Sequence, residues 1–130
     1  MENVVVDASV VVEALIRPEF AAVVEAAVGR PTMVAPDLIN VEVLSALRGL
    51  EHRQVLTTEE AERCLDQFLL APIRRLGTRR LMHATWMLRN NVTAYDGTYL
   101  ALAAQLRFPF VTRDARLARS AGVSVPVLVL

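Results

Sequence analysis

The chain has 130 residues, of which 54% are apolar, and its fourteen basic and fourteen acidic side chains cancel to a net charge of zero. Every basic residue is Arg, which excludes chemistry that needs a Lys amine, such as a Schiff base or a phosphate-binding P-loop. The single Cys64 excludes an internal disulfide and a zinc–cysteine cluster, and the neutral charge excludes a global field that attracts nucleic acid.

Size and composition also indicate the surroundings of the protein. One domain over residues 1–130 is expected, because a chain of this length can bury a substantial core. Charged residues are only 22% of the chain, so some apolar surface is expected to be covered by a partner. The N-terminal apolar run is interrupted by Asp7 and Glu13 and resembles neither a signal peptide nor a membrane span. A cytoplasmic protein without membrane contact is therefore predicted.

The first part of the chain alternates short β-branched runs with helical patterns. Residues 4–6 predict a buried parallel strand, and helices are predicted over residues 9–16 and 19–28. A second short strand is predicted over residues 32–35. The apolar spacing after it predicts a helix over residues 37–50.

The middle of the chain is mostly helical in pattern. Thr57 or Thr58 is the expected cap of a helix that reaches residue 70, and a weakly signalled strand follows over residues 72–76. Residues 77–89 predict a helix whose left-handed end would suit Asn90-Asn91. The next predicted helix covers residues 93–106.

The last part of the chain returns to strands. A strand over residues 108–112 is followed by a short helix over 114–121, ended by Gly122, and by a terminal strand over 125–130. Strands that alternate with helices in this way predict an α/β domain with a mostly parallel sheet and right-handed crossovers.

Four carboxylates lie at predicted strand ends or early in the helices that follow: Asp7, Glu42, Asp96 and Asp114. The carboxyl ends of parallel strands meet at one edge of a sheet, where ligands bind. Like charges gathered there either share protons or bind a divalent cation. The sequence therefore predicts that these four acids form one site.

Each acid also has a simpler structural explanation. Asp7 and Asp114 each precede a predicted helix and can act as its N-cap. Asp96 can be the acid of a capping box that begins at Thr93. Capping explains three of the acids one at a time, whereas a single metal site explains all four together.

Helix geometry favours the shared site for Asp96 and Glu42. Asp96 lies on the same helix face as Tyr99 and Leu100, where a merely solvated acid is unexpected. Glu42 lies among small and apolar neighbours, and no basic residue follows it before Arg48. Burial of an uncompensated carboxylate is costly, so a metal ion or a distant Arg is expected to compensate Glu42.

The residue types at this site restrict its chemistry. Oxygen-only ligands suit Mg²⁺ or Mn²⁺ and argue against zinc or copper. No His, Lys or Cys belongs to the cluster, so a metal-activated water is the expected nucleophile. These features predict hydrolysis of a phosphodiester. A separate group of arginines can meet phosphates, or equally form a solvated face or meet a partner's acids: Arg74, Arg75, Arg79 and Arg80.

Four short motifs, in order along the chain, carry a family resemblance: Val-Val-Val-Asp-Ala-Ser at residues 4–9, Asn-Val-Glu at 40–42, Thr-Ala-Tyr-Asp-Gly-Thr-Tyr-Leu-Ala-Leu-Ala at 93–103 and Val-Thr-Arg-Asp at 111–114. Together they resemble the PIN domain and, within it, the VapC-type toxins of toxin–antitoxin pairs. The resemblance covers essentially the whole chain. Gly97 departs from the pattern slightly, since many relatives have Ala after the third acid.

The resemblance implies a three-layer α/β/α fold with a five-stranded parallel sheet. It implies that Asp7, Glu42, Asp96 and Asp114 bind Mg²⁺ or Mn²⁺, and that the hydroxyls of Ser9 and Thr112 orient carboxylates or water beside them. An endoribonuclease toxin that cuts RNA is the implied function. A homodimer and a cognate VapB-type antitoxin that occludes the site are the implied partners.

Two other functions are compatible with an α/β chain of this length. A non-catalytic binding module could keep the fold without turnover, although the complete set of four acids argues against it. A phospho-accepting receiver domain needs an acidic pair after the first strand and a Lys after the last. The chain offers Asp7 alone at the first place and no Lys anywhere.

Overall fold

The computed structural model describes residues 1–120 and 124–130. Its strands are β1 (Asn3–Val6), β2 (Thr32–Pro36), β3 (Ile73–Leu76), β4 (Phe110–Thr112) and β5 (Val127–Val129). Its α-helices are α1 (Ala8–Ile16), α2 (Pro18–Val28), α3 (Leu38–His52), α4 (Thr58–Leu70), α5 (Met82–Met87), α6 (Ala94–Leu106) and α7 (Ala115–Ala118), and a 3₁₀ turn, η1 (Arg79–Leu81), precedes α5.

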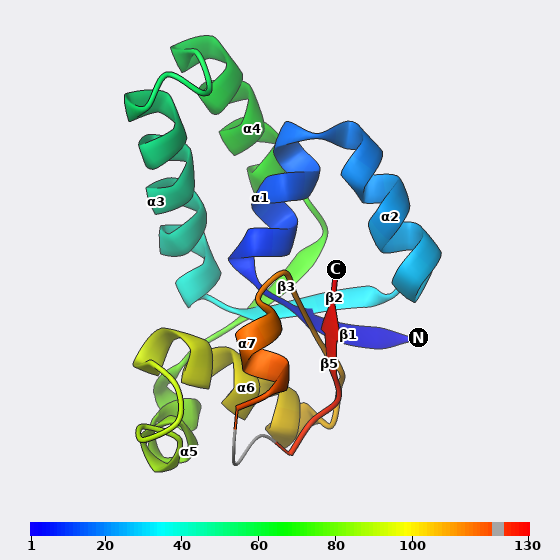
Figure 1. Ribbon diagram of the computed structural model, residues 1–130, viewed down its shortest axis with the longest axis vertical. Helices are drawn as coiled ribbons and strands as arrows, with labels where there is room; N and C mark the ends of the chain where they lie inside the picture. The colour runs from blue at the N-terminus through cyan, green and yellow to red at the C-terminus, as the bar shows by residue number, and fades with distance from the viewer. Residues whose placement is uncertain (121–123) are drawn as a thin grey trace.

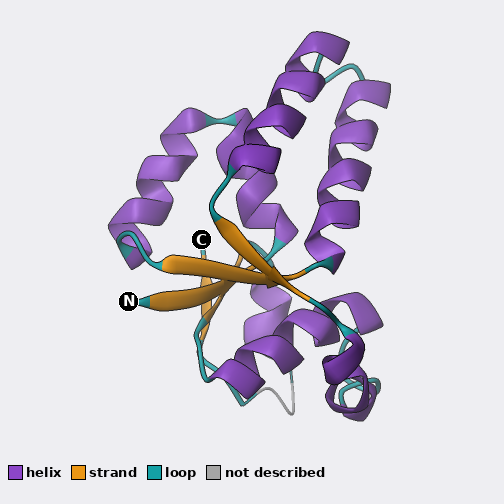
Figure 2. Cartoon of the chain, turned by 180° about the vertical axis from the view of Figure 1, so that it is seen from behind, coloured by secondary structure: helices purple, strands orange, loops and turns teal. Residues whose placement is uncertain are grey.

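The five strands form one parallel sheet in the order β3-β2-β1-β4-β5. Helices α1 to α4 lie on one side of the sheet, and α5 and α6 lie on the other (Figures 1 and 2). The predicted α/β class and its three layers are therefore confirmed. This strand order differs from the 2-1-3-4-5 order of receiver domains, so the receiver interpretation is wrong.

The strand order places a topological switch beside β1. The chain adds β2 and β3 on one side of β1, then crosses over to add β4 and β5 on the other side. Val5 of β1 donates a backbone hydrogen bond to Pro109, and the Asp7 amide donates one to Val111 at 3.2 Å. The carboxyl ends of β1 and β4 are thus neighbours, which is the position where open α/β sheets bind ligands.

The core is centred on β1 and on α6. The β1 valines are almost completely buried, as expected for a central parallel strand covered on both faces. The Tyr99 ring of α6 lies 5.8 Å from the Phe110 ring of β4, centroid to centroid. Gly97 lets α6 approach α5 closely, because a Cβ there would lie 3.2 Å from the Thr85 methyl group. The departure at Gly97 therefore has a packing role.

Three local predictions are wrong. The predicted helix over residues 77–89 is instead the 3₁₀ turn η1 followed by the short α5, and turns cover residues 88–91. Asn90 and Asn91 are not left-handed, because the Asn91 and Val92 amides both bond to the Leu88 carbonyl in right-handed turns. The helix predicted over 114–121 is shorter than expected, and its predicted end at Gly122 lies outside the described residues. No helix in the described part of the chain is long and apolar enough to cross a membrane.

Candidate active site

Asp7 lies at the junction of β1 and α1, and it is the N-cap of α1. One carboxylate oxygen, Oδ1, accepts hydrogen bonds from the Ser9 amide at 3.0 Å, the Val10 amide at 3.3 Å and the Ser9 hydroxyl at 2.5 Å. The other oxygen, Oδ2, accepts a bond from the Thr112 hydroxyl at 2.5 Å. The capping interpretation of Asp7 is therefore confirmed, and its second oxygen links β1 to β4.

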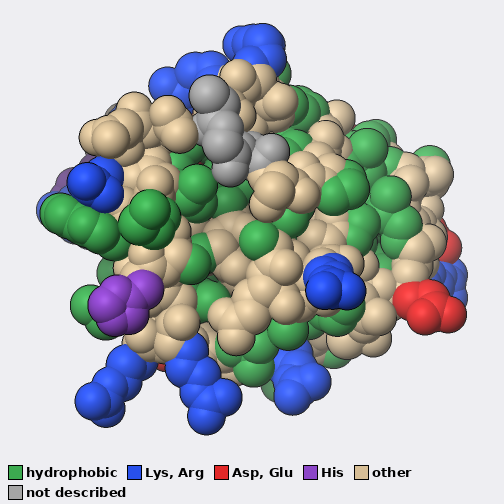
Figure 3. All heavy atoms as spheres, turned by 90° about the horizontal axis from the view of Figure 1, so that it is seen from below, with side chains coloured by type: hydrophobic (Ala, Val, Ile, Leu, Met, Phe, Trp, Pro, Cys, Tyr) green, Lys and Arg blue, Asp and Glu red, His purple; other side chains and the backbone are tan. Residues whose placement is uncertain are grey.

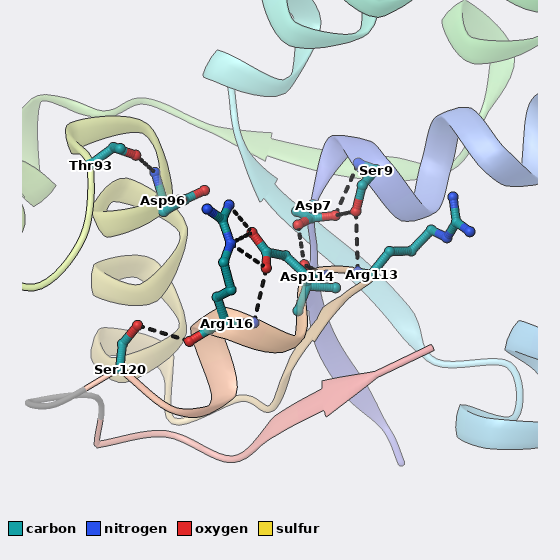
Figure 4. Close-up of polar contacts among 9 residues, drawn as sticks. Asp7, Ser9, Thr93, Asp96, Arg113, Asp114, Arg116 and Ser120 are labelled. Carbon is teal, nitrogen blue, oxygen red and sulfur yellow. Dashed lines mark hydrogen bonds and ion pairs between the residues drawn. The ribbon is translucent and has the colours of Figure 1, made fainter.

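The loop after β4 is fastened to the same carboxylate. Thr112 is completely buried, and its hydroxyl both donates to Asp7 and accepts the Asp114 amide at 3.1 Å. The Ser9 hydroxyl accepts the Arg113 amide at 3.2 Å. Both hydroxyls predicted beside the acids therefore contact Asp7, and each also binds the backbone that leads to Asp114 (Figure 4).

The carboxylate of Glu42 in α3 accepts a hydrogen bond from a phenol. The Tyr99 hydroxyl of α6 donates a 2.6 Å hydrogen bond to Oε1 of Glu42, across 57 residues of sequence. Burial raises the pKa of Tyr99 far above its ordinary value, and the bond to Glu42 raises it further, so Tyr99 remains a protonated donor. Among the described residues no Arg forms an ion pair with Glu42, and its pKa remains raised, so the distant Arg is not found and a metal ion at Glu42 stays a prediction.

Asp96 and Asp114 face one another from α6 and α7. The Thr93 hydroxyl accepts the Asp96 amide at 3.1 Å, so this cap uses the backbone of Asp96. Asp114 caps α7 by accepting the Arg116 amide at 2.9 Å. The Arg116 guanidinium binds the Asp114 carboxylate and lies on the side of Asp96 (Figure 4). Asp114 is thus confirmed as an N-cap, whereas the capping-box interpretation of Asp96 is wrong, because its carboxylate does not bond back to the Thr93 amide.

The pKa values of three acids are raised. Burial is the largest cause for Asp7, Glu42 and Asp96. The charges of Asp7 and Asp96 also raise the pKa of Glu42, and the charge of Asp114 raises that of Asp96. Asp114 differs, because the hydrogen bond from Arg116 holds its pKa below the ordinary value. Charge repulsion therefore links Glu42 to Asp7 and Asp96, and links Asp96 to Asp114.

A PIN-domain family model matches residues 4–123, which is nearly the whole chain. The chain belongs to the PIN-domain family. It is 38% identical to Ribonuclease VapC1 of Mycobacterium tuberculosis over 125 residues, covering 95% of this chain and 94% of that protein. It is 35% identical to Ribonuclease VapC12 of the same species, covering 92% of each chain. The protein is thus a VapC-type PIN domain.

The fold is also shared with a solved member of this group. The crystal structure of VapBC2 from Rickettsia felis, bound to a DNA fragment from their promoter, matches 96% of this chain and 96% of the other with a TM-score of 0.70. The sequence identity over this match is 12%, so the likeness concerns the fold.

The acids of this PIN domain do not form a closed set of metal ligands. Over residues 1–120 and 124–130, no three His, Cys, Asp or Glu side chains group closely enough to hold an ion. Their chemistry nevertheless suits a hard cation, because the donors are all oxygens and a cation would offset both the burial of these carboxylates and the repulsion that adds to the pKa values of Glu42 and Asp96. One of the four acids, Asp114, is paired with Arg116 in this arrangement.

Sequence reasoning missed two residues of this PIN domain site. On sequence grounds, Tyr99 was treated only as an apolar neighbour of Asp96. Its position three residues after Asp96 places it on the same face of α6, which was the available sign that its hydroxyl could reach the site. Arg116 was not singled out, although it follows Asp114 by two residues, within reach of a cap. Arg116 and Asp96 line a groove of about 530 Å³ together with Arg89, Asn90 and Asn91.

One member of the predicted basic patch is occupied elsewhere. The Arg75 guanidinium donates to the Asn40 side chain at 2.7 Å and to the carbonyls of Ile73 and Phe68. It also lies 4.4 Å from the centroid of the Phe68 ring. Arg75 therefore joins β3 to α3 and α4 and does not offer a free guanidinium to phosphate.

Proposed function

We propose that this chain is a Mg²⁺- or Mn²⁺-dependent endoribonuclease and the toxin of a toxin–antitoxin pair. The observation that carries the proposal is the hydrogen-bonded junction of Asp7 with Ser9 and Thr112, with Asp114 on the same loop. Ribonuclease VapC1 and Ribonuclease VapC12 match this chain over 94% and 92% of their own length. Asp7 and Asp114 follow neighbouring strands, Glu42 and Asp96 lie in α3 and α6, and a cation held by the four acids would let them act on an anionic phosphodiester.

In this proposal Asp7, Glu42, Asp96 and Asp114 hold the cation. The bound cation supplies charge neutralisation and activates a water for attack on phosphorus. Ser9 and Thr112 fix the orientation of the Asp7 carboxylate through their hydroxyls. Tyr99 keeps Glu42 pointed into the site and favours its ionised form, since its hydrogen bond lowers the pKa of Glu42.

The surface beside these acids suits a polyanion. Arg89 and Arg116 line the groove that contains Asp96, together with the amides of Asn90 and Asn91. Arg side chains surround the face seen in Figure 3, and acidic side chains are visible mainly at one edge. Arginines can bind phosphates of the RNA backbone without a strongly basic chain. Single-stranded or looped RNA is the proposed substrate.

The partners are also part of the proposal. Several large apolar side chains are exposed, among them Met82, Trp86 and Met87 of α5 at 66%, 64% and 73%. Exposed apolar patches of this kind indicate protein–protein contact. We therefore propose a VapB-type antitoxin and a homodimer as partners. Light scattering of the purified chain, alone and with a coexpressed antitoxin, measures both. A monomer that binds no antitoxin contradicts this part.

The nuclease proposal is tested by one matched pair of variants. Purified wild type, Asp96→Asn and Asp66→Asn are incubated with structured RNAs, with Mn²⁺ or with chelator. Asp66 is an exposed acid of α4 outside the site, so its variant controls for loss of one charge. Cleavage is expected in wild type and Asp66→Asn and is expected to vanish with chelator or in Asp96→Asn. Cleavage that persists in Asp96→Asn contradicts the proposed site.

A non-catalytic binding module is the second candidate. The observation that favours it is the Arg116 guanidinium, which forms a 2.6 Å ion pair with Asp114. Such a module would bind RNA without cutting it, and its binding would be the same with and without Mn²⁺. An electrophoretic mobility shift assay of the same RNAs, in chelator and in Mn²⁺, measures binding. RNA binding without cleavage supports the binding module, and Mn²⁺-dependent cleavage supports the nuclease.

A further inference from the structure

Glu13 of α1 is a buried carboxylate that lies between two arginines. Only 8% of the residue is exposed. Its Oε1 is 2.7 Å from Nε of Arg17, and its Oε2 is 2.9 Å from Nη1 of Arg113. A buried carboxylate is tolerated only when it is paired, so these two arginines together account for its presence in the core.

The two arginines connect Glu13 to different parts of the fold. Arg17 follows Glu13 by four residues, at the end of the same helix, so this pair is local to α1. Arg113 comes from the loop between β4 and α7, 100 residues away in sequence. Its guanidinium also lies 5.4 Å from the centroid of the Phe20 ring of α2. Only the Arg113 pair joins the site loop to α1 and α2.

Arg113 is fastened to α1 by its backbone as well. Its amide donates to the Ser9 hydroxyl, and the same hydroxyl donates to Asp7. Ser9 and Glu13 are four residues apart and therefore share one face of α1. In Figure 4 the Arg113 side chain extends beside α1 and away from Asp114, which points to Arg116.

The residues on either side of Arg113 both belong to the proposed site. Thr112 donates to Asp7, and Asp114 is one of the four acids. A loop fixed to α1 at one side chain and one amide has little freedom to shift Asp114 relative to Asp7. Misplacement by about 1 Å can cost roughly 100-fold in rate, so such fixing is functionally important.

We propose that Arg113 is a positioning residue, and that its ion pair with buried Glu13 sets the distance between Asp7 and Asp114. This inference rests on the proposed nuclease function. The proposed role of Arg113 involves no contact with substrate or metal. Arg113 acts through the loop, and Glu13 serves as its fixed anchor on α1.

The test uses Arg113→Gln and its matched control Arg17→Gln, both in the full chain. Each variant removes one of the two positive charges from the same carboxylate, but only Arg113→Gln releases the loop. Three quantities are measured: the Mn²⁺ dissociation constant by calorimetry, kcat and KM on RNA, and hydrogen exchange without metal of the two backbone amides at positions 113 and 114.

Arg113→Gln is expected to weaken Mn²⁺ binding roughly tenfold, the lower range for loss of a ligand-orienting contact. It is expected to lower kcat more than it changes KM, and to speed exchange of the two loop amides. Arg17→Gln is expected to match wild type in all three. Equal effects of both variants would show that Glu13 acts through stability alone, and wild-type behaviour of Arg113→Gln would overturn the proposal directly.

Two further comparisons keep the test decisive. If Arg113→Gln does not fold, Arg113→Lys and Arg17→Lys replace the pair, because Lys keeps the charge but not the planar fork. Arg113→Lys is then expected to bind Mn²⁺ more weakly than Arg17→Lys, and equal binding overturns the proposal. If wild type neither binds Mn²⁺ nor cuts RNA, the proposed function fails. The amide exchange then still decides whether the Glu13–Arg113 pair fixes the loop.

Discussion

The Arg116 guanidinium binds both carboxylate oxygens of Asp114, with Nη2 2.6 Å from Oδ2 and Nε 3.0 Å from Oδ1. The Arg116 amide donates to Oδ1 as well. Asp114 therefore stays ionised but is neutralised by a residue two positions away. Arg116 also lowers the pKa of Asp96, so its charge reaches both acids. A divalent cation that enters the site has to compete with this guanidinium.

Replacing Arg116 is expected to tighten metal binding. Arg116→Gln removes the competing charge, and the pair is solvent-exposed, so the expected gain in Mn²⁺ affinity is modest, roughly threefold. Arg119→Gln is the control, because Arg119 also lowers the pKa of Asp114 by its charge but donates no hydrogen bond to it. Calorimetry with Mn²⁺ alone measures the effect. Weaker binding in Arg116→Gln than in Arg119→Gln would mean that Arg116 supports the metal site.

Removing the Tyr99 hydroxyl is expected to change the pH dependence of the site. The hydrogen bond from Tyr99 lowers the pKa of Glu42, so Tyr99→Phe raises that pKa further above its ordinary value. If Glu42 holds the cation as proposed, Mn²⁺ binding requires its ionised form, and the acid, low-pH limb of the Mn²⁺-binding profile is expected to move to higher pH. The unfolding free energy is expected to fall by about 1–3 kcal/mol, because a partly buried acceptor loses its donor. Tyr95→Phe, on the exposed side of α6, is the control. An unshifted acid limb in Tyr99→Phe contradicts the role given to Glu42.

The metal-free protein is expected to lose stability as pH rises. Asp7, Glu42 and Asp96 have raised pKa values, so the folded state binds more protons than the unfolded state between the ordinary values of 3.8 and 4.5 and the raised ones. Their contribution is complete below the ordinary values and disappears as pH rises through the raised values. Asp114 makes the opposite contribution to the pH dependence of stability. Its pKa is lowered, so it stabilises the fold above its ordinary pKa, and this stabilisation is lost only as pH falls through the lowered value.

Asp96→Asn tests this electrostatic cost. In chelator near neutral pH, the variant is expected to melt about 2–4 °C higher than wild type, the shift that roughly 1 kcal/mol produces in a domain of this size. Mn²⁺ is expected to raise the melting temperature of wild type and not that of Asp96→Asn. Melting curves from about pH 4 to about pH 8 measure both. A variant less stable than wild type in chelator would mean that Asp96 is mainly structural.

Thr85 offers a test of packing away from the acids. Its buried hydroxyl has no hydrogen-bond partner among the described residues, and its methyl group packs against Gly97. Thr85→Val replaces the unpaired hydroxyl by a methyl group of similar shape. The unfolding free energy is expected to rise by about 1 kcal/mol, with Mn²⁺ binding unchanged. Urea unfolding measures the change, and a destabilised variant would indicate an ordered water at this hydroxyl.

The site residues that follow strands were predictable from the sequence. Asp7 directly follows β1, Thr112 is the last residue of β4 and Asp114 lies two residues beyond it, and parallel strands bring such positions to one edge. Their capping roles were predictable for the same local reason. The pairs between distant segments were not, because no local signal links Tyr99 to Glu42 or Arg113 to Glu13. Those contacts depend on how α6 and α1 are rotated in the core.

The region between β3 and α6 was the least predictable part of the fold. One helix was predicted over residues 77–89, but Gly77 and Thr78 are weak helix formers, and the 3₁₀ turn η1 comes first after them. Tertiary contact then selects the short α5, which packs against α6 at Gly97. Left-handed backbone occurs at Gln54 and Arg107, where no Asn or Gly marked it.

The pairing of β1 with β4 also determines when the site can exist during synthesis. The Thr112 hydroxyl that binds Asp7 is more than one hundred residues later in the chain, and β4 itself is paired with β5 at residues 127–129. Contacts of such long sequence separation form late, after the rest of the sheet offers a template. An unfinished chain therefore carries Asp7 without its partner loop. The junction of Asp7 with Thr112 can therefore form only after residues 110–114 have been synthesised.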